Sequence, residues 1–148
     1  MSNQSGNTKL WQKQGGLHPK VEAFTIGNDA EHDLKLARYD VLGSIAHARM
    51  LGEIGILDAR EVKQLTDELS RIHTVIEQDK FAIEEGVEDV HSQIEIMLTR
   101  ALGDTGKKIH TARSRNDQVL VDLKLYLRAE IREMVRGMEQ IIDTFLEL

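Results

Sequence analysis

The sequence predicts an all-α protein in which a small N-terminal helical domain precedes the first long helix of a bundle. Apolar residues recur at steps of three and four along four segments, which is typical of amphipathic helices. No segment combines apolar and polar alternation with β-branched residues, so no strand is expected. The last segment, 117–148, keeps a heptad pattern to its final residue, as bundle helices do.

The first two helices are predicted over residues 33–50 and from Asp58 onward. The apolar face of the first consists of Leu34, Ala37, Val41, Ile45 and Ala48, and Gly52 and Gly55 mark its end. Asp58 and Glu61 have the spacing of a capping box. The stripe that follows consists of Val62, Leu65, Leu69, Ile72 and either Val75 or Ile76.

A third helix is predicted to begin near Asp89. Its apolar positions are Ile94, Met97, Leu98 and Ala101. Gly103 and Gly106 bracket the turn expected after it.

The fourth segment carries a heptad seam. The seam consists of Leu120, Leu123, Leu127, Ile131, Met134, Met138, Ile141, Phe145 and Leu148. Each seam residue contributes about 2 kcal/mol only when it is buried, whereas ordering the backbone costs about 1–2 kcal/mol per residue. We therefore expect this helix to lie in a bundle completed by other segments or subunits, the alternative being a solvent-exposed helix. Because no Gly, Pro or basic last turn closes the pattern, we expect this chain to be part of a longer protein.

Composition excludes several classes of protein. A net charge of −6 argues against general nucleic-acid binding, and the absence of Cys excludes disulfides and thiol chemistry. Residues 1–20 are polar and hold no acid, so we predict a mobile arm rather than a signal peptide. No apolar run has the length of a membrane span, and a cytoplasmic location is expected. Without a zinc, dinucleotide, Walker or EF-hand motif, no metal or cofactor is expected.

The basic turn, residues 107–118, is the richest segment in polar chemistry. Ser114 and Asp117 have capping-box spacing, which alone would explain both residues. Arg113 and Arg115 oppose the positive end of the helix dipole, at a cost of roughly 0.3–1 kcal/mol each. A bound anion would offset that cost through charge-assisted hydrogen bonds. Both interpretations, an anion site and a simple helix cap, remain open from the residues alone.

A second candidate constellation is Asp89 and His91, separated by one residue. The pair can set the charge and tautomer of an imidazole at a functional site. Asp89 can equally be a helix N-cap, and the spacing alone favours that interpretation.

The chain resembles the argininosuccinate lyase family of the fumarate-producing lyase superfamily. The resemblance covers nearly the whole chain and is carried by residues 110–118 (HTARSRNDQ), 88–91 (EDVH) with Glu95, 40–44 (DVLGS) and Leu10-Trp11. It implies an all-α fold with a small first domain and a central helical bundle that assembles a homotetramer. On that basis, we predict an N-terminal helical domain over 21–112 and the truncated start of the central bundle over 113–148.

The resemblance also implies a reaction, the β-elimination of argininosuccinate to arginine and fumarate in arginine biosynthesis. Cationic and amide donors would stabilise charge that develops on the substrate carboxylates. Carried over by motif, Asn116 would bind substrate, Ser114 and Arg115 would grip a carboxylate end, and Asp89 and His91 would support the same pocket. The predicted substrate-binding set also includes Arg113 and Thr111. No cofactor, metal, nucleic acid or membrane partner is implied.

Two departures from the family pattern affect these expectations. The Gly-Gly-Arg-Phe that often follows the Trp is replaced by residues 12–16 (QKQGG). The family's substrate-binding Ser after Phe24 is missing, and Thr25 or Asn28 would substitute for it. The family's catalytic His and Ser loop would lie beyond Leu148, so no catalytic residue is predicted here and the chain alone is expected to be inactive. The alternatives are a non-catalytic, crystallin-like relative and a helical anion-binding interaction module.

Overall fold

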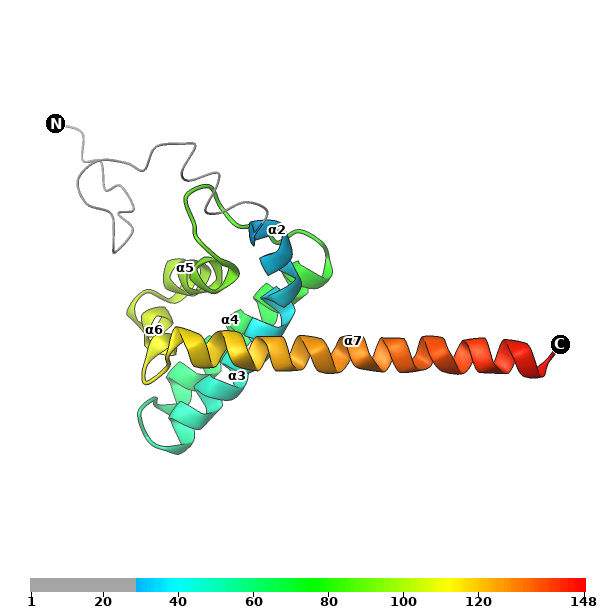
Figure 1. Cartoon of the computed structure of the whole chain (residues 1–148). Coiled ribbons are helices and arrows are strands. Elements are labelled where there is room, and N and C mark those ends of the chain that lie inside the picture. The colour runs from blue at the N-terminus through cyan, green and yellow to red at the C-terminus, as the bar shows by residue number, and fades with distance from the viewer. Residues whose placement is uncertain (1–28) are drawn as a thin grey trace.

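The structure, a computed structural model, describes residues 29–148, and all regular secondary structure in that range is helical, as predicted. The predicted arm at residues 1–20, together with Thr25 and Asn28, lies outside the described residues. The elements in chain order are α2 (Asp29–Asp33), the 3₁₀ turn η1 (Leu34–Leu36), α3 (Ala37–Glu53), α4 (Ala59–Glu77), α5 (Val90–Leu102), α6 (Asp104–Lys107), the 3₁₀ turn η2 (Lys108–His110) and α7 (Arg115–Leu146). Helices α3 to α6 form a packed body, from which α7 extends as one long rod (Figure 1).

The α3–α4 hairpin is the centre of the body. Asp58 caps α4 and forms the predicted capping box, since Asp58 Oδ1 accepts from the Glu61 N–H at 2.8 Å and Glu61 Oε2 accepts from the Asp58 N–H at 3.2 Å. The buried core draws on α3, α4, α5 and the connecting turns. Its members are Val41, Ala48, Leu51, Leu57, Leu65, Leu69, Ile72, Ile94, Leu98 and Ile109.

Three local predictions were wrong. The first α-helix was expected to begin at Asp33, but the 3₁₀ turn η1 precedes α3, and Leu34 is 37% exposed and contributes nothing to the core. Ala101 is exposed, because it lies on the solvent side of α5. Gly106 lies inside α6 rather than at a turn. A Cβ there would lie 2.3 Å from the Leu98 carbonyl oxygen, so only glycine allows α6 to pack this closely on α5.

Helix α7 packs against α3 through its first turns only. Gln118 and Asp122 are its buried residues, while the heptad seam is exposed from Leu120 to Leu148. At 32 residues, α7 is about 48 Å long, and its second half projects past the body (Figure 1). Within residues 29–148 nothing covers the projecting seam, so the expected bundle stays a prediction, as do the domain boundaries at 112 and 113. None of the described helices combines the length and apolarity needed to cross a membrane.

Candidate functional site

The basic turn leads into α7, and Ser114 is the N-cap of that helix. Ser114 Oγ accepts a hydrogen bond from the Asn116 N–H at 3.3 Å. The predicted capping box with Asp117 is not formed, because the Ser114 hydroxyl bonds to the amide two residues on instead of three. Ser114, Asn116 and Asp117 are exposed, so the side chains at the start of α7 are accessible to a ligand.

Arg115 lies on the surface between α5 and α7 and is held by groups from both helices. Its guanidinium donates to Gln118 Oε1 at 3.1 Å and to Ser92 Oγ at 3.2 Å. Two carboxylates also lie close, Asp89 Oδ2 at 3.7 Å and Glu95 Oε1 at 3.5 Å. The Arg115 side chain remains 36% exposed, so it is orientated for recognition without being enclosed.

Arg113 has a different environment, buried beside α3. Its side chain is 8% exposed, donates to Ser44 Oγ at 2.8 Å and lies 3.6 Å from Asp40 Oδ1. Its charge is already satisfied inside the protein, and the expectation that Arg113 binds substrate stays a prediction. Both arginines have carboxylate partners in the chain, so a bound anion is not needed to offset their position at the helix start.

His91, which was expected to support the same pocket, is buried, with 1% of its surface exposed. Its Nδ1 lies 3.4 Å from Asp40 Oδ1 and 3.5 Å from Asp122 Oδ2. We call Asp40, His91, Asp122 and Arg113 the buried cluster. It joins α3, α5, α7 and the basic turn. Both carboxylate oxygens of Asp122 lack a hydrogen-bond partner among the described residues.

Burial controls the protonation of this cluster. Desolvation, reinforced by the neighbouring charge of Asp40, raises the pKa of Asp122 to about 7. For His91, burial by itself lowers the pKa. The hydrogen bond and charge of Asp40, with the charges of Asp89 and Asp122, outweigh burial and raise the His91 pKa above its ordinary value. The cluster therefore holds protons near neutral pH that the unfolded chain would release.

The same cluster is the one group of donors within residues 29–148 with the spacing of a metal site. One ligand atom each from Asp40, His91 and Asp122 lie within 4.8 Å of one another. Three protein ligands are fewer than the four of a structural zinc site, although catalytic zinc sites have three, but the Arg113 guanidinium already supplies positive charge beside Asp40. The donor set therefore fits shared protons and an arginine better than it fits a cation.

Two other predicted site residues, Asp89 and Thr111, lie at the start of α5 and in the basic turn. Asp89 is the N-cap of α5, where its Oδ1 accepts from the Ser92 N–H at 2.6 Å, and it also approaches Arg115. Thr111 is half-buried, and its carbonyl oxygen lies 3.0 Å from His47 Nε2. The structure thus brings Asp89, Ser114, Arg115 and Asn116 into one surface region, with Thr111 on the adjoining turn.

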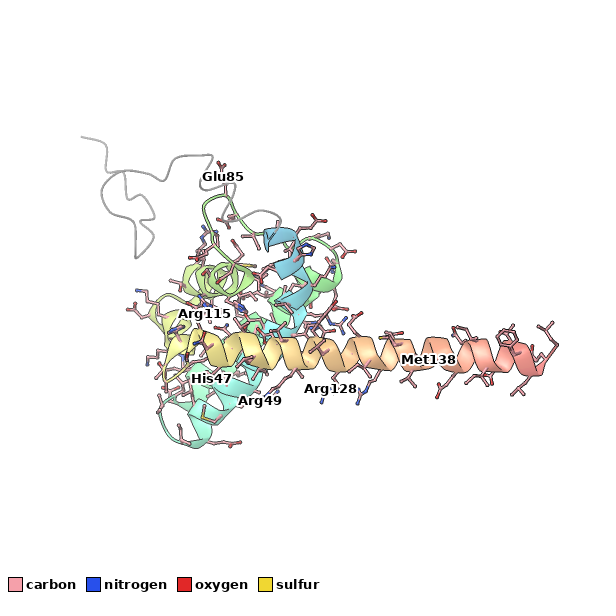
Figure 2. The ribbon with its side chains drawn as sticks, viewed as in Figure 1. His47, Arg49, Glu85, Arg115, Arg128 and Met138 are labelled. Carbon is pink, nitrogen blue, oxygen red and sulfur yellow. The ribbon has the colours of Figure 1, made fainter. Side chains whose placement is uncertain are left out.

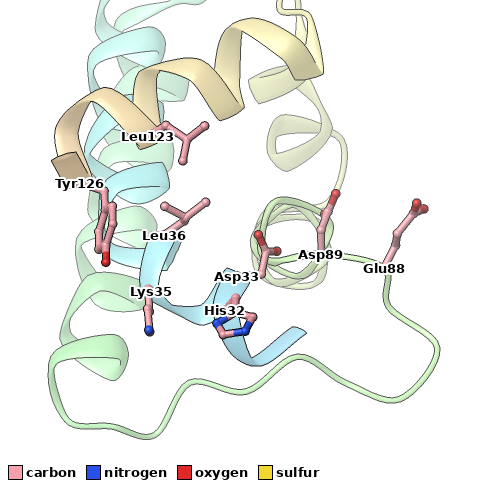
Figure 3. Close-up of a pocket in the computed structure, with 8 residues that line it drawn as sticks. All are labelled: His32, Asp33, Lys35, Leu36, Glu88, Asp89, Leu123 and Tyr126. Atoms are coloured by element: carbon pink, nitrogen blue, oxygen red, sulfur yellow. The ribbon is translucent and has the colours of Figure 1, made fainter. Parts of the chain in front are cut away.

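A cavity of about 540 Å³ lies beside this region, and Asp89 belongs to both. Figure 3 shows Asp33 and Asp89 near the start of α5, with Leu36, Leu123 and Tyr126 along the opposite wall. Asp33 Oδ2 accepts from the Val90 N–H at 2.7 Å, which ties α2 to the start of α5. Glu88 adds a further carboxylate, while Lys35 and His32 also line the cavity.

Sequence reasoning did not identify Asp40, Gln118 and Asp122 as site residues. Gln118 and Asp122 are four residues apart and share one face of α7, as Asp40 and Ser44 do on α3. Polar residues at that spacing within an apolar helix pattern were the available signal. Gln118 Nε2 donates to Asp40 Oδ1 at 2.6 Å, joining the two faces.

These features define a class of protein: an all-helical domain with a polar, arginine-bearing turn at the start of a bundle-type helix. The family model described as "Lyase" matches residues 17–148, so the chain belongs to that lyase family. It is 55% identical over 138 residues to the argininosuccinate lyase of Bacteroides thetaiotaomicron, covering 93% of this chain and 31% of the relative. It is also 46% identical to that of Trichlorobacter lovleyi (94% and 30% covered) and 42% identical to that of Thermotoga neapolitana (94% and 36% covered). The chain thus spans about a third of the length of these curated relatives.

Proposed function

We propose that this chain is part of an argininosuccinate lyase, which cleaves argininosuccinate to arginine and fumarate in arginine biosynthesis. The observation that supports this proposal most directly is the 55% identity to an argininosuccinate lyase over 93% of the chain. The family relationship and the accessible Ser114, Arg115 and Asn116 agree with it. By the same relationship, we propose a cytoplasmic homotetramer whose α7 helices lie in the central bundle.

In this proposal Arg115 and Asn116 bind a carboxylate of the substrate. The guanidinium offers charge-assisted hydrogen bonds, and it is held in place by Ser92 and Gln118. Asn116 adds an amide donor on the adjacent exposed position. Asp89 and the other carboxylates of the neighbouring cavity complement the guanidino group of argininosuccinate. The catalytic groups come from sequence outside this chain, so the 148 residues alone are inactive.

The test compares the complete enzyme with Arg115→Ala in a fumarate-release assay. Loss of one charge-assisted contact, about 1.5–3 kcal/mol, lowers kcat/KM by about tenfold or more. Arg49→Ala is the matched control, because Arg49 is an exposed arginine elsewhere in the body (Figure 2). Equal kcat/KM values for both variants and the unaltered enzyme would remove Arg115 from the site. Absence of fumarate release by the complete enzyme would refute the proposed activity itself, and fumarate release by the 148-residue chain alone would refute its assigned inactivity.

A further inference from the structure

We propose that Asp40 is a positioning residue that clamps the basic turn onto α3 and so presents Arg115 and Asn116 to the ligand. The identity of that ligand rests on the proposed function. The clamp itself rests on contacts within this chain, which can be measured without any ligand.

One Asp40 carboxylate oxygen holds groups from both sides of the α7 N-cap. After the cap, Gln118 Nε2 donates to Asp40 Oδ1 at 2.6 Å. Before the cap, the Arg113 guanidinium lies 3.6 Å from the same oxygen and donates to Ser44 Oγ, one turn along α3, at 2.8 Å. We call the contacts of Gln118 and Arg113 with α3 the two anchors. They flank residues 114–117, the segment proposed to bind the ligand.

Burial makes these anchors strong. Asp40 is 0% exposed and Gln118 3% exposed, so water does not compete for the hydrogen bond between them. Breaking the bond would leave the buried Gln118 Nε2 without a partner and would deprive the Asp40 carboxylate of its shortest hydrogen bond, which costs more than the bond itself contributes. The turn is therefore fixed by a contact between residues separated by 78 positions in the chain.

The backbone beside the anchors also requires such a constraint. Ala112 has φ = 55°, a left-handed conformation that is unfavourable for a residue with a Cβ. A strained residue persists where the surrounding structure determines it. Arg113, held by Ser44 and Asp40, is the next residue, so the clamp supplies a reason for the strain at Ala112.

The clamp also separates the roles of the two arginines. Arg113 is 8% exposed and neutralised by Asp40, whereas Arg115 is 36% exposed. A turn fixed in this way holds the recognition groups in place before the ligand arrives, which reduces the entropy lost on binding. Asp40 thus acts on the ligand through the turn and does not touch it.

The test measures amide hydrogen exchange of the 148-residue chain with and without Asp40→Ala, which removes the oxygen that accepts from Gln118. We expect peptides covering 111–119 to exchange about tenfold faster in the variant, with little change in α4. Leu69→Ala is the control for general destabilisation, because Leu69 is a buried α4 residue outside the turn, and it should accelerate exchange mainly in the body. Unchanged exchange at 111–119, or an equal acceleration throughout the chain, would overturn the proposal.

Two further variants keep the test decisive if Asp40→Ala is too unstable to study. Ser44→Ala removes the hydrogen bond that Arg113 donates but leaves the Asp40–Gln118 bond in place, so it should accelerate exchange at 111–113 more than at 118. Asp40→Asn combined with Gln118→Glu reverses the donor and acceptor while keeping one carboxylate near Arg113, and it should restore slow exchange. Failure of both expectations would exclude the clamp.

Kinetics of the complete enzyme then connect the clamp to the ligand. Asp40→Ala should raise KM for argininosuccinate by about tenfold, whereas a merely less stable enzyme would lose kcat through a smaller active fraction and keep its KM. A lowered kcat with unchanged KM would contradict the positioning role. If the unaltered enzyme does not turn over argininosuccinate, the proposed function fails, but the exchange measurement still decides whether the clamp exists.

Discussion

The two halves of α7 have the same kind of sequence pattern but opposite surroundings. The first half rests on α3, where Gln118 and Asp122 are buried, and Tyr126 meets Tyr39 edge to face with ring centroids 5.9 Å apart. The second half, which includes Met138 (57% exposed), projects beyond the body (Figure 2). The difference teaches that apolar periodicity determines a helix and one of its faces, while burial of that face depends on which partners are present.

Substitutions in the packed region should lower the free energy of unfolding more than substitutions in the projecting half of α7. The largest loss is expected in the core of the body. Leu65 on α4 is 0% exposed, so Leu65→Ala should lower the free energy of unfolding by about 2–5 kcal/mol through lost burial and a cavity. Chemical denaturation followed by circular dichroism measures this loss. A change below 1 kcal/mol would mean that the body is not packed around this residue.

A medium effect on the free energy of unfolding is expected from the titration of Asp122, which belongs to the buried cluster and lies in the packed half of α7. The pKa of Asp122 is raised to about 7 from 3.8, so the folded state holds its proton more tightly than the unfolded state does. The stabilisation is complete below the unfolded value near 3.8 and is lost as pH rises through about 7. The raised His91 pKa acts in the same direction above 6.5.

Asp122→Asn removes the Asp122 contribution and isolates it from the surface carboxylates. Relative to this variant, the unaltered chain should lose unfolding free energy between about pH 4 and pH 7. The readout is the difference between the two denaturation curves at each pH. A difference that is constant with pH would show that Asp122 titrates normally in the folded chain.

The smallest change in stability is expected from substitutions in the projecting half of α7. Met138→Ser removes an exposed apolar side chain and should change the stability of the 148-residue chain by no more than about 0.5 kcal/mol. The same substitution in a complete enzyme, where the proposed bundle would bury the seam, should cost several-fold more. A large cost already in the isolated chain would mean that the projecting half is covered there, and the contrast between the two halves would disappear.

Local features were predictable because the information lies in adjacent residues. The Asp58–Glu61 capping box and the buried Leu65, Leu69 and Ile72 of α4 follow from spacings of three and four. Asp89 and Ser114 were each named as one of two alternatives, a helix cap or a site residue, and both are caps, because short polar side chains before an apolar run satisfy free amides at a helix start. Only the partner of Ser114 differed from the expected one.

The candidate site was predictable only in part. Arg115 and Asn116 were identified from the motif and lie on the surface, whereas Arg113, two positions from Arg115, turns inward to Ser44. Nothing in the local sequence separates the two arginines. The difference in burial between the two arginines depends on Asp40, which is far away in the chain and looks like an ordinary polar residue of an amphipathic helix.

By itself, the sequence determined the four main helices, most of their apolar faces, their cap residues and membership of a lyase family, because each depends on residue type and short-range spacing. The tertiary structure alone decided which polar residues became buried together. Asp40, His91 and Asp122 come from three helices, and the cost of burying a charge is set by what the fold places beside it. The same long-range packing decided that Arg113 serves the fold and that Arg115 remains accessible.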